Sequence, residues 1–449
     1  MGEESLLRIC RIEALGLFNL YQHKVPLNLD QRVTIIHGPN GVGKTVLLRL
    51  LASLCSGRLT EFARIPFGKF LVTLSDGSEL SVVPGRTNGS IKPGGQDICV
   101  SVKDRDGVRE IKLPSPLADS AIEAQLELPG LERAEPVRWT DIYPHPMLSP
   151  SREVWWTYGG IVPPSIRFQP SFEGPEWFAA KRKQVRVHLI EAQRLIRVAT
   201  TPPQHYGLRE ETQLISAVRG NAQDLQVRIT EALKQLSIES QALDQTIPER
   251  LLKEPARKLS IDELKERMKS IQERQKRLQA IGLLDEGSAS PFDVASLDQL
   301  QEAKRNIMAL YVEDSEKKLG VLAGLAGRIE LLVGNLNEKF QHKVIRVDRE
   351  RGFVASTGNG QPLELDALSS GEQHELVLLY DLLFRVQPNT LVLIDEPELS
   401  LHVEWQKRFL ADLLQIVKAA DIDALVATHS PFIVGDRSDL MVPLETEVS

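Results

Sequence analysis

The sequence predicts an α/β fold whose two halves are separated by a helical insertion. The apolar run at residues 33–36 is followed by a glycine-rich segment and a helix start, which is a strand–loop–helix pattern. From about residue 206 to 341 the apolar side chains take helical spacing. An apolar stretch at residues 390–394 is typical of a buried parallel strand. We therefore expect a head of parallel strands with an antiparallel β subdomain, formed by residues 1–205 and 342–449.

The composition excludes several classes of protein. The 449 residues carry a net charge of −7, so no global attraction to nucleic acid or to an anionic membrane is expected. The three cysteines, Cys10, Cys55 and Cys99, lie far apart, which favours a reducing compartment over a disulfide framework or a zinc site. The N-terminus does not resemble a signal peptide, and no apolar run approaches the length of a membrane span. We expect a cytoplasmic protein that does not cross a membrane.

The first half of the head is predicted to be rich in strands. Residues 6–29 alternate loosely and indicate two strands around a turn at 16–19. The turn sequences at 75–78 and 104–107 lie between alternating runs, so we expect two β-hairpins. The proline-rich stretch from 114 to 175 is expected to be irregular. A further strand at 184–190 leads to Gln193.

The insertion is predicted to be helical from about residue 210. Ser260 and Glu263 form a capping box that begins its second helix. That helix carries a heptad seam with one polar position: Ile261, Leu264, Met268, Ile271, Gln275 and Leu278. We expect breaks near 248–255 and 285–291, where Pro, Gly and Ser collect. The helices look short for a coiled coil, since about 22 residues reach roughly 33 Å. A protruding arm and a compact helical subdomain both remain open.

The C-terminal part is predicted to alternate strands and helices. A hairpin is expected at 344–355, and a helix from 368 to about 384. The strand at 390–394 is followed by a helix at 403–417 and by a strand at 424–427. His429 follows this last strand.

The glycine-rich segment has the spacing GxxxxGK[ST]. Backbone N–H groups of such a loop wrap phosphates at the positive end of the following helix. We expect Lys44 to reach the β- and γ-phosphates of a nucleotide and the Thr45 hydroxyl to bind Mg²⁺. The predicted phosphate-binding residues are Gly38, Asn40, Gly41, Gly43, Lys44 and Thr45.

Two carboxylates and a histidine follow predicted parallel strands. Asp395 is expected to hold Mg²⁺ and Glu396 to orient or deprotonate the attacking water, because carboxyl ends of parallel strands face the ligand. His429 is placed to contact the γ-phosphate or the water. Gln193 could reach Mg²⁺ or the water, although Glu191 or Arg194 could fill that place.

A second capped helix start supplies another candidate anion site. Ser369 and Glu372 form an S-x-x-E capping box around Ser370 and Gly371. Helix N-termini bind anions, and this one does not follow the phosphate loop in sequence. It could therefore meet the γ-phosphate of a nucleotide that another subunit holds.

This ordered set resembles the ABC ATPase superfamily. Residues 38–45 look like its Walker A, Gln193 its Q-loop, and residues 368–372 its LSGGQ signature. Asp395 and Glu396 look like Walker B with the catalytic glutamate, and His429 like the switch histidine. Ser400 and His402 occupy the D-loop. Ser370 and His402 depart from the transporter pattern and, with the phrases IDEPELSLH and ATHSPF, resemble the soluble RecF, Rad50 and OLD-like branch (AAA_15- or AAA_21-like). The resemblance covers about half of the chain, at its two ends.

The resemblance implies ATP and Mg²⁺ as cofactors and a homodimer, or an oligomer of dimers. Each ATP would be held by Lys44 of one copy and by Ser369 and Gly371 of the other. Hydrolysis would open the pair, and the helical insertion would pass that motion to a partner.

Three functions compete. The first is an ATPase of a prokaryotic anti-phage system such as PARIS or Septu, which works with a separate effector that we expect to be a nuclease. Because only residues 430–449 follow His429, we do not expect a TOPRIM domain in this sequence. The second is a RecF- or Rad50-like repair ATPase that contacts DNA through basic residues at 181–186 or on the second helix; the zinc-hook CxxC of Rad50 is missing. A transporter subunit is disfavoured, because Gln193 and Leu368 are separated by a long helical segment.

Overall fold

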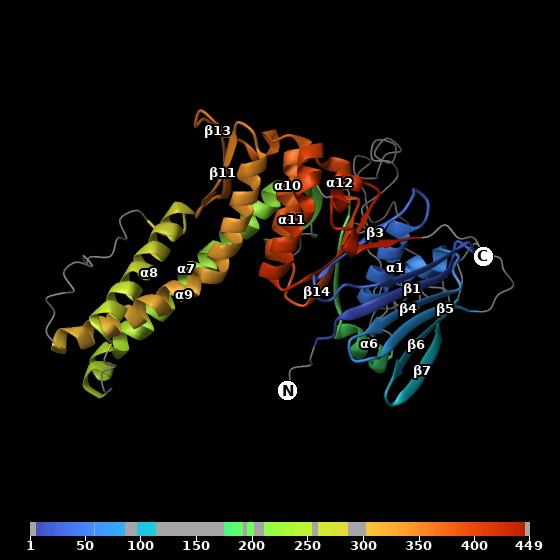
Figure 1. Cartoon of the computed structure of the whole chain (residues 1–449), viewed down its shortest axis with the longest axis horizontal. Coiled ribbons are helices and arrows are strands. Elements are labelled where there is room, and N and C mark those ends of the chain that lie inside the picture. Colours follow the sequence, from blue (N-terminus) through green and yellow to red (C-terminus); the bar gives the residue numbers. More distant parts are fainter. Residues whose placement is uncertain are drawn as a thin grey trace. The chain divides into compact units, whose positions relative to one another are not determined.

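The computed structural model describes residues 6–57, 59–85, 97–113, 175–191, 195–201, 211–253, 259–285 and 302–444. The chain divides into two compact units. The first is Met1–Leu214 with Arg385–Ser449, and the second is Ile215–Phe384. The first unit holds the sheets that carry the glycine loop, and the second holds the long helices and the Ser369 helix start (Figure 1). The predicted stretch at 114–175 and Gln193 lie outside the described residues, except for residue 175.

A five-stranded parallel sheet forms the centre of the first unit. Its order is β16 (Met441–Pro443), β3 (Val33–His37), β15 (Asp423–Thr428), β14 (Thr390–Asp395) and β8 (Arg186–Ile190). All four pairings are parallel. Every residue of β14 and β15 is buried, which is why both strands are continuously apolar in sequence apart from their ends. The predicted strands are confirmed, and the carboxyl ends of β3, β14 and β15 share one edge.

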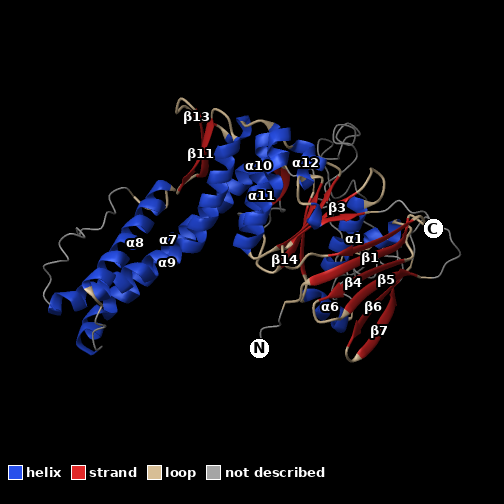
Figure 2. Ribbon diagram, in the orientation of Figure 1, coloured by secondary structure: helices blue, strands red, loops and turns tan. Residues whose placement is uncertain are grey.

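An antiparallel sheet of six strands completes this unit. Its order is β2 (Tyr21–Pro26), β1 (Ile9–Leu17), β4 (Lys69–Leu74), β5 (Glu79–Pro84), β6 (Ile98–Asp104) and β7 (Gly107–Leu113). The expected hairpins β4–β5 and β6–β7 are confirmed. Helix α1 (Lys44–Ser56) shares one core with both sheets, and Phe62 of α2 (Thr60–Arg64) stacks edge-on against Phe70 of β4 in it. Figure 2 shows α1 among the strands of this unit.

The remaining elements of the first unit flank the sheets. Helix α6 (Glu176–Lys183) precedes β8, and α11 (Val403–Ala420) connects β14 to β15. Helix α12 (Pro431–Val434) packs against α11, and a short 3₁₀ turn, Ser438–Leu440, leads into β16. These connections bring the residues after β14 and after β15 next to each other.

The start of the insertion differs from the sequence prediction. Residues from 210 were expected to be helical, but Glu211–Ser216 form strand β10, which pairs with β9 (Ile196–Thr201). Helix α7 begins only at Ala217. The segment before it, ETQLIS, has two β-branched members, Thr212 and Ile215, and its pairing with a neighbouring strand prevails over helix propensity.

Three helices make up most of the second unit: α7 (Ala217–Lys253), α8 (Ile261–Ala280) and α9 (Glu302–Lys339). Helix α9 packs against both α7 and α8 (Figure 2). The predicted seam of α8 is buried at Leu264, Met268, Ile271 and Leu278, and its capping box is formed. Helices α7 and α9 have 37 and 38 residues, about 55 Å each, so the prediction of short helices is wrong for them.

The break expected near 248–255 is confirmed, but Pro248 does not cause it: α7 continues through this proline and ends at Lys253, and α8 begins at Ile261. A proline removes one backbone donor and crowds the preceding turn. The carbonyl of Leu243 in that turn accepts hydrogen bonds from the Arg250 guanidinium and the Thr246 hydroxyl. Arg250 also pairs with Asp314 of α9. Tertiary contacts therefore hold the helix across the proline.

Among the described residues one helix, within Lys304–Lys339 of α9, is long and apolar enough to cross a membrane. The sequence prediction of no such run is corrected here. The same helix carries Asp314, Glu316 and Glu330, which pair with arginines of α7 and α8. Its apolar side chains at Val312, Leu322, Ile329 and others face the bundle and are buried. These contacts account for the part of the apolar stretch that is buried, which is 33% of it.

The second unit ends in a small sheet and a helix. Strands β11 (Lys343–Asp348), β12 (Gly352–Thr357) and β13 (Pro362–Leu363) confirm the predicted hairpin and extend it. A Cβ at Gly352 would lie 1.9 Å from the Ala222 carbonyl oxygen, so glycine lets β12 lie directly on α7. A 3₁₀ turn, Leu365–Ala367, leads to α10 (Ser370–Tyr380), which packs on α7 and α9 and is followed by a π-helical turn, Asp381–Arg385.

Candidate functional site

The glycine loop connects β3 to α1 at the carboxyl edge of the parallel sheet. Gly41 and Gly43 have φ angles of 88° and 96°, which L-residues rarely adopt. A Cβ at Gly43 would lie 2.7 Å from Cδ2 of the buried Leu17, so the backbone approaches β1 more closely than a side chain permits. In the described part of the chain no side chain caps the start of α1, and its first turn has no acidic residue. The amides there are left for an anion.

Lys44 is the first residue of α1 and is buried. Its Nζ donates hydrogen bonds to the carbonyl oxygens of Gly38 (2.7 Å) and Pro39 (3.0 Å), so the side chain curls back across the loop. Burial lowers the pKa of Lys44, and the carboxylates of Glu396, Glu398 and Asp395 partly offset this. The ammonium is therefore held where phosphates would meet the loop.

Thr45 and Asp395 come together from distant parts of the sequence. The Thr45 hydroxyl donates a 2.9 Å hydrogen bond to Oδ1 of Asp395, at the end of β14. Burial raises the pKa of Asp395, and the bond from Thr45 only partly opposes that effect. A cation would stabilise this buried carboxylate. A hydroxyl and a carboxylate beside phosphate oxygens are the oxygen ligands that Mg²⁺ prefers, so the residues present fit Mg-ATP.

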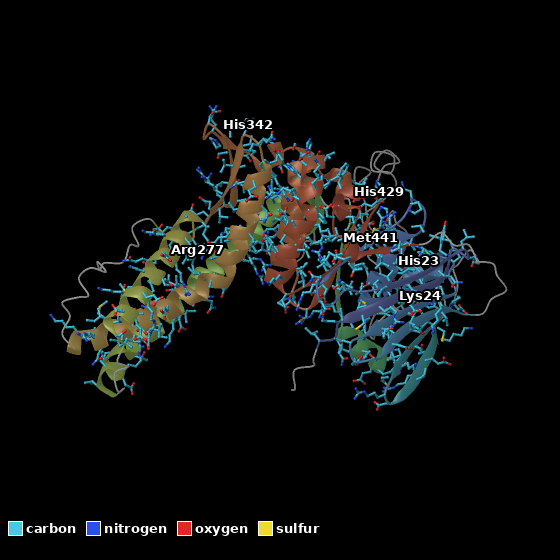
Figure 3. The ribbon with its side chains drawn as sticks, in the orientation of Figure 1. His23, Lys24, Arg277, His342, His429 and Met441 are labelled. Atoms are coloured by element: carbon cyan, nitrogen blue, oxygen red, sulfur yellow. The ribbon has the colours of Figure 1, made fainter. Side chains whose placement is uncertain are left out.

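Glu396 follows Asp395 with a left-handed backbone, φ 42° and ψ 59°. Its amide donates to the carbonyl oxygen of Ala427 in the neighbouring strand (2.9 Å). Such a conformation in a non-glycine residue is strained and persists where the surroundings impose it. Its Oε1 lies 3.7 Å from Nδ1 of His429, so the two predicted catalytic residues are adjacent (Figure 3 labels His429).

Glu398 was missed by the sequence prediction. Its carboxylate is buried, lies 3.1 Å from Nδ1 of His429 and accepts hydrogen bonds from Thr428, His429 and Ser430. The signal was a second acidic residue within three positions of Asp395, in a segment otherwise interpreted only as a D-loop. A buried carboxylate needs donors, and the nearest available donors are the residues that follow β15.

His23 is a second residue that the sequence prediction missed. It is buried on β2, and its Nε2 donates to the carbonyl oxygen of Val42 in the glycine loop (2.8 Å). Tyr21 stacks on its ring at 5.7 Å. Burial lowers the pKa of His23, which keeps the ring neutral. The antiparallel sheet thus contacts and stabilises the glycine loop through His23. Figure 3 labels His23 and the exposed Lys24 next to it in sequence.

The two D-loop residues are placed differently. Ser400 ends the 3₁₀ turn Pro397–Ser400. His402 caps α11: its Nδ1 accepts a hydrogen bond from the amide of Glu404 at 3.4 Å. The cap is a sufficient structural reason for a polar residue at this position.

The signature residues lie in the other compact unit, at the start of α10. Ser369 is the N-cap, and its hydroxyl and the Glu372 carboxylate form the predicted capping box. Lys343 of β11 adds a 2.6 Å ion pair to Glu372. Burial alone would raise the pKa of Glu372, but the bonds from Lys343 and Ser369 outweigh it and hold the pKa below its usual value. Ser370 and Gly371 form the first turn of this helix.

Comparisons with known proteins are consistent with this site. Residues 244–435 match the family model described as "AAA domain, putative AbiEii toxin, Type IV TA system". The matched segment contains α10, Asp395, Glu396 and His429 but not the glycine loop. This segment is therefore similar to that family, and together with the glycine loop it supports a P-loop ATPase domain.

Solved structures similar to this chain include heads of Smc proteins. The Smc head domain of Pyrococcus furiosus, with an extended coiled coil and bound to the C-terminal domain of ScpA, is 14% identical over 99% of this chain and 95% of that chain, with a TM-score of 0.34. The Smc head with coiled coil and joint of Pyrococcus yayanosii is 15% identical over 99% and 96%, with a TM-score of 0.32. The SMC head of Thermotoga maritima is 12% identical over 97% and 94%, with a TM-score of 0.32. Because TM-scores this low carry no detail, the fold is defined by the strand order of this chain.

Proposed function

We propose that this protein binds and hydrolyses Mg-ATP as a head-to-tail dimer and uses the cycle to regulate a separate effector. The observation that carries the proposal is the Thr45–Asp395 hydrogen bond, with Glu396 and His429 3.7 Å apart beside it. A phosphate loop, a metal-binding pair and a water-orienting pair are the groups that phosphoryl transfer to water needs.

Each residue has a distinct task in this reaction. Loop amides and Lys44 hold the β- and γ-phosphates, and Thr45 with Asp395 holds Mg²⁺. When bound, Mg²⁺ offsets phosphate charge and orients the γ-phosphate. Glu396 orients the attacking water and accepts its proton. The strained backbone of Glu396 keeps its carboxylate beside His429, which lowers the cost of ordering the two groups in the transition state.

Pairing of two copies is supported by the surface around His429. Leu399, Val403 and Phe432 are 60%, 45% and 47% exposed, although large apolar side chains are mostly buried in this unit. They belong to the turn after Glu396, to the start of α11 and to α12, which packs on α11. A second copy whose α10 start approaches this face would cover them and supply Ser369 and Gly371 to the γ-phosphate.

A role in prokaryotic defence is supported by the matching family, whose description names a putative toxin of a type IV toxin–antitoxin system. The nuclease identity of the effector is part of the proposal. The long α7–α9 bundle supplies a surface for such an effector. A repair ATPase that binds DNA is the second candidate. It is less well supported, because Arg267 and Arg277 of α8 pair with glutamates of α9 and Lys181 pairs with Asp76.

The decisive experiment is affinity purification of Glu396→Gln with ATP. This variant should lose hydrolysis by about 100-fold or more while it keeps ATP. Light scattering should report a dimer with ATP and a monomer with ADP. Glu404→Gln removes a carboxylate from an exposed pair with Lys407 and is the matched control; it should hydrolyse ATP like the parent protein.

The recovered partners discriminate among the functions. A stoichiometric nuclease supports the defence role. Hydrolysis stimulated by DNA without a protein partner favours the repair ATPase. Recovery of membrane permeases would contradict both, and an ATP-bound monomer of the variant would contradict the paired site.

A further inference from the structure

Glu398 is a buried carboxylate in a short turn. Only 5% of its side chain is exposed. It lies in the 3₁₀ turn Pro397–Ser400, directly after Glu396 and Pro397. Burying a carboxylate is costly unless several donors surround it, so this residue is held for a purpose.

The donors come from the end of the neighbouring strand β15. Oε1 of Glu398 accepts hydrogen bonds from the Thr428 hydroxyl (2.6 Å) and from the amides of His429 (2.9 Å) and Ser430 (3.2 Å). The turn is fastened further by Gln406, whose Nε2 donates to the Glu398 carbonyl and whose Oε1 accepts from the Ser430 hydroxyl. One oxygen therefore ties the segment after β14 to the segment after β15.

The same oxygen faces the ring of His429. Nδ1 lies 3.1 Å from Oε1 of Glu398 and 3.7 Å from Oε1 of Glu396. A bare Nδ1 would place its lone pair against those of two carboxylates, which is repulsive. Nδ1 therefore carries the proton, and in the neutral ring Nε2 is an acceptor.

We propose that Glu398 is a positioning residue that fixes both the place and the tautomer of His429, so that Nε2 meets the attacking water. A water molecule can donate to a bare Nε2, whereas a phosphate oxygen cannot. With the proton on Nδ1, Nε2 of His429 assists Glu396 by orienting the water. This inference rests on the proposed ATPase function for its kinetic part, but the tautomer of His429 does not depend on turnover.

Nitrogen-15 spectra of histidine-labelled protein test the tautomer directly. His429→Gln identifies the His429 signals, which are read on the alkaline limb of the titration, where the ring is neutral. In the parent protein we expect Nδ1 protonated and Nε2 bare. Glu398→Gln keeps the size and one carbonyl oxygen but removes the charge, so a substantial Nε2-protonated population should appear. Glu404→Gln should leave the His429 spectrum unchanged.

The kinetic part is measured on the same variants. Glu398→Gln should lower kcat about tenfold, which is less than the loss of a general acid or base would cause. Its KM for ATP should stay within about twofold of the parent value. A purely structural role would not move the tautomer. A rise in KM with kcat unchanged would overturn the proposal.

The parent spectrum needs no variant and tests the proposal even if Glu398→Gln fails to fold. A neutral His429 protonated on Nε2 in the parent overturns the proposal. A tautomer shift in Glu398→Gln without any ATPase activity in the parent would uphold the positioning of His429 and defeat the proposed function.

Discussion

The chain contains two helix starts with opposite designs. Helix α1 follows its N-cap Gly43, and the described residues place no side-chain cap or acidic residue in its first turn. Helix α10 begins at Ser369 with a complete capping box, and Glu372 lies in its first turn. Both were predicted to meet phosphates, yet only the first leaves its amides open.

The difference shows that a helix start can be an anion site in two ways. At α1 the loop leaves its amides without a side-chain cap, and the Lys44 ammonium lies beside them. At α10 the Ser369 hydroxyl and amide are engaged by Glu372, whose charge Lys343 offsets. A phosphate at α10 must displace bonds that the helix already makes, so we expect the first site to bind nucleotide and the second to respond to it.

Removing the charge at the open helix start should have the largest effect. Lys44→Ala should lower kcat/KM for ATP by about 100-fold or more, because the ammonium stabilises charge on the phosphates. Lys24→Ala, at an exposed lysine of β2, is the matched control and should keep full activity. Titration calorimetry and a phosphate-release assay measure both; an active Lys44→Ala would refute the open-site assignment.

A methyl group in the glycine loop should have the next largest effect. Ala at a positive φ costs about 1–2 kcal/mol, and both Gly41→Ala and Gly43→Ala bear this cost. Only the Gly43 methyl group meets Leu17, which adds about 1–3 kcal/mol of crowding. Chemical denaturation should therefore rank Gly43→Ala as clearly less stable than Gly41→Ala. Equal stabilities would mean that the loop does not press on β1.

The capped start of α10 is compared with the capped start of α8, which lies in the same unit. Ser369→Ala and Ser260→Ala each remove a capping box and should each cost about 1 kcal/mol of stability. Only Ser369→Ala should prevent ATP-dependent pairing in the Glu396→Gln background, as followed by light scattering. If both variants pair normally, the α10 start does not contact nucleotide.

The smallest expected effects are opposite stability changes at the two sites. The pKa of Glu372 is depressed, so its charge stabilises the fold above the unfolded pKa of about 4.3, and this is lost as pH falls through the folded value. The pKa of Asp395 is raised in the folded state. Its protonated carboxyl group therefore stabilises the fold below the unfolded pKa of about 3.9, and this stabilisation is lost as pH rises through the folded pKa.

At pH 7, Asp395→Asn should therefore raise the melting temperature without nucleotide, and Glu372→Gln should lower it, each by about 2 °C. Scanning calorimetry at pH 7 and pH 4 checks the signs, and both differences should shrink at the lower pH. A loss of stability in Asp395→Asn at pH 7 would contradict the raised pKa of this buried carboxyl group.

Local patterns were sufficient for the strands and for much of the site. The apolar runs that became β3, β14 and β15 are buried on both faces, so their composition alone reveals them. The Ser260 and Ser369 capping boxes could also be predicted, because all their bonds form within four residues. The continuation of α7 through Pro248 and the strand β10 could not be predicted, since Asp314 of α9 and strand β9 act on them from elsewhere in the chain.

The amino-acid sequence by itself determined the chemical groups: the phosphate loop, the carboxylates that end a buried strand, and the capped helix start. These depend on short-range spacing and on apolar composition. Only the tertiary structure decided which groups meet. The parallel register of β14 and β15 places Glu396 and Glu398 next to His429. This proximity depends on the order of strands in the sheet, which the residues near each position in the sequence do not determine. The same reason explains why Glu398 stayed hidden: its donors, at positions 428–430, are contributed by another strand.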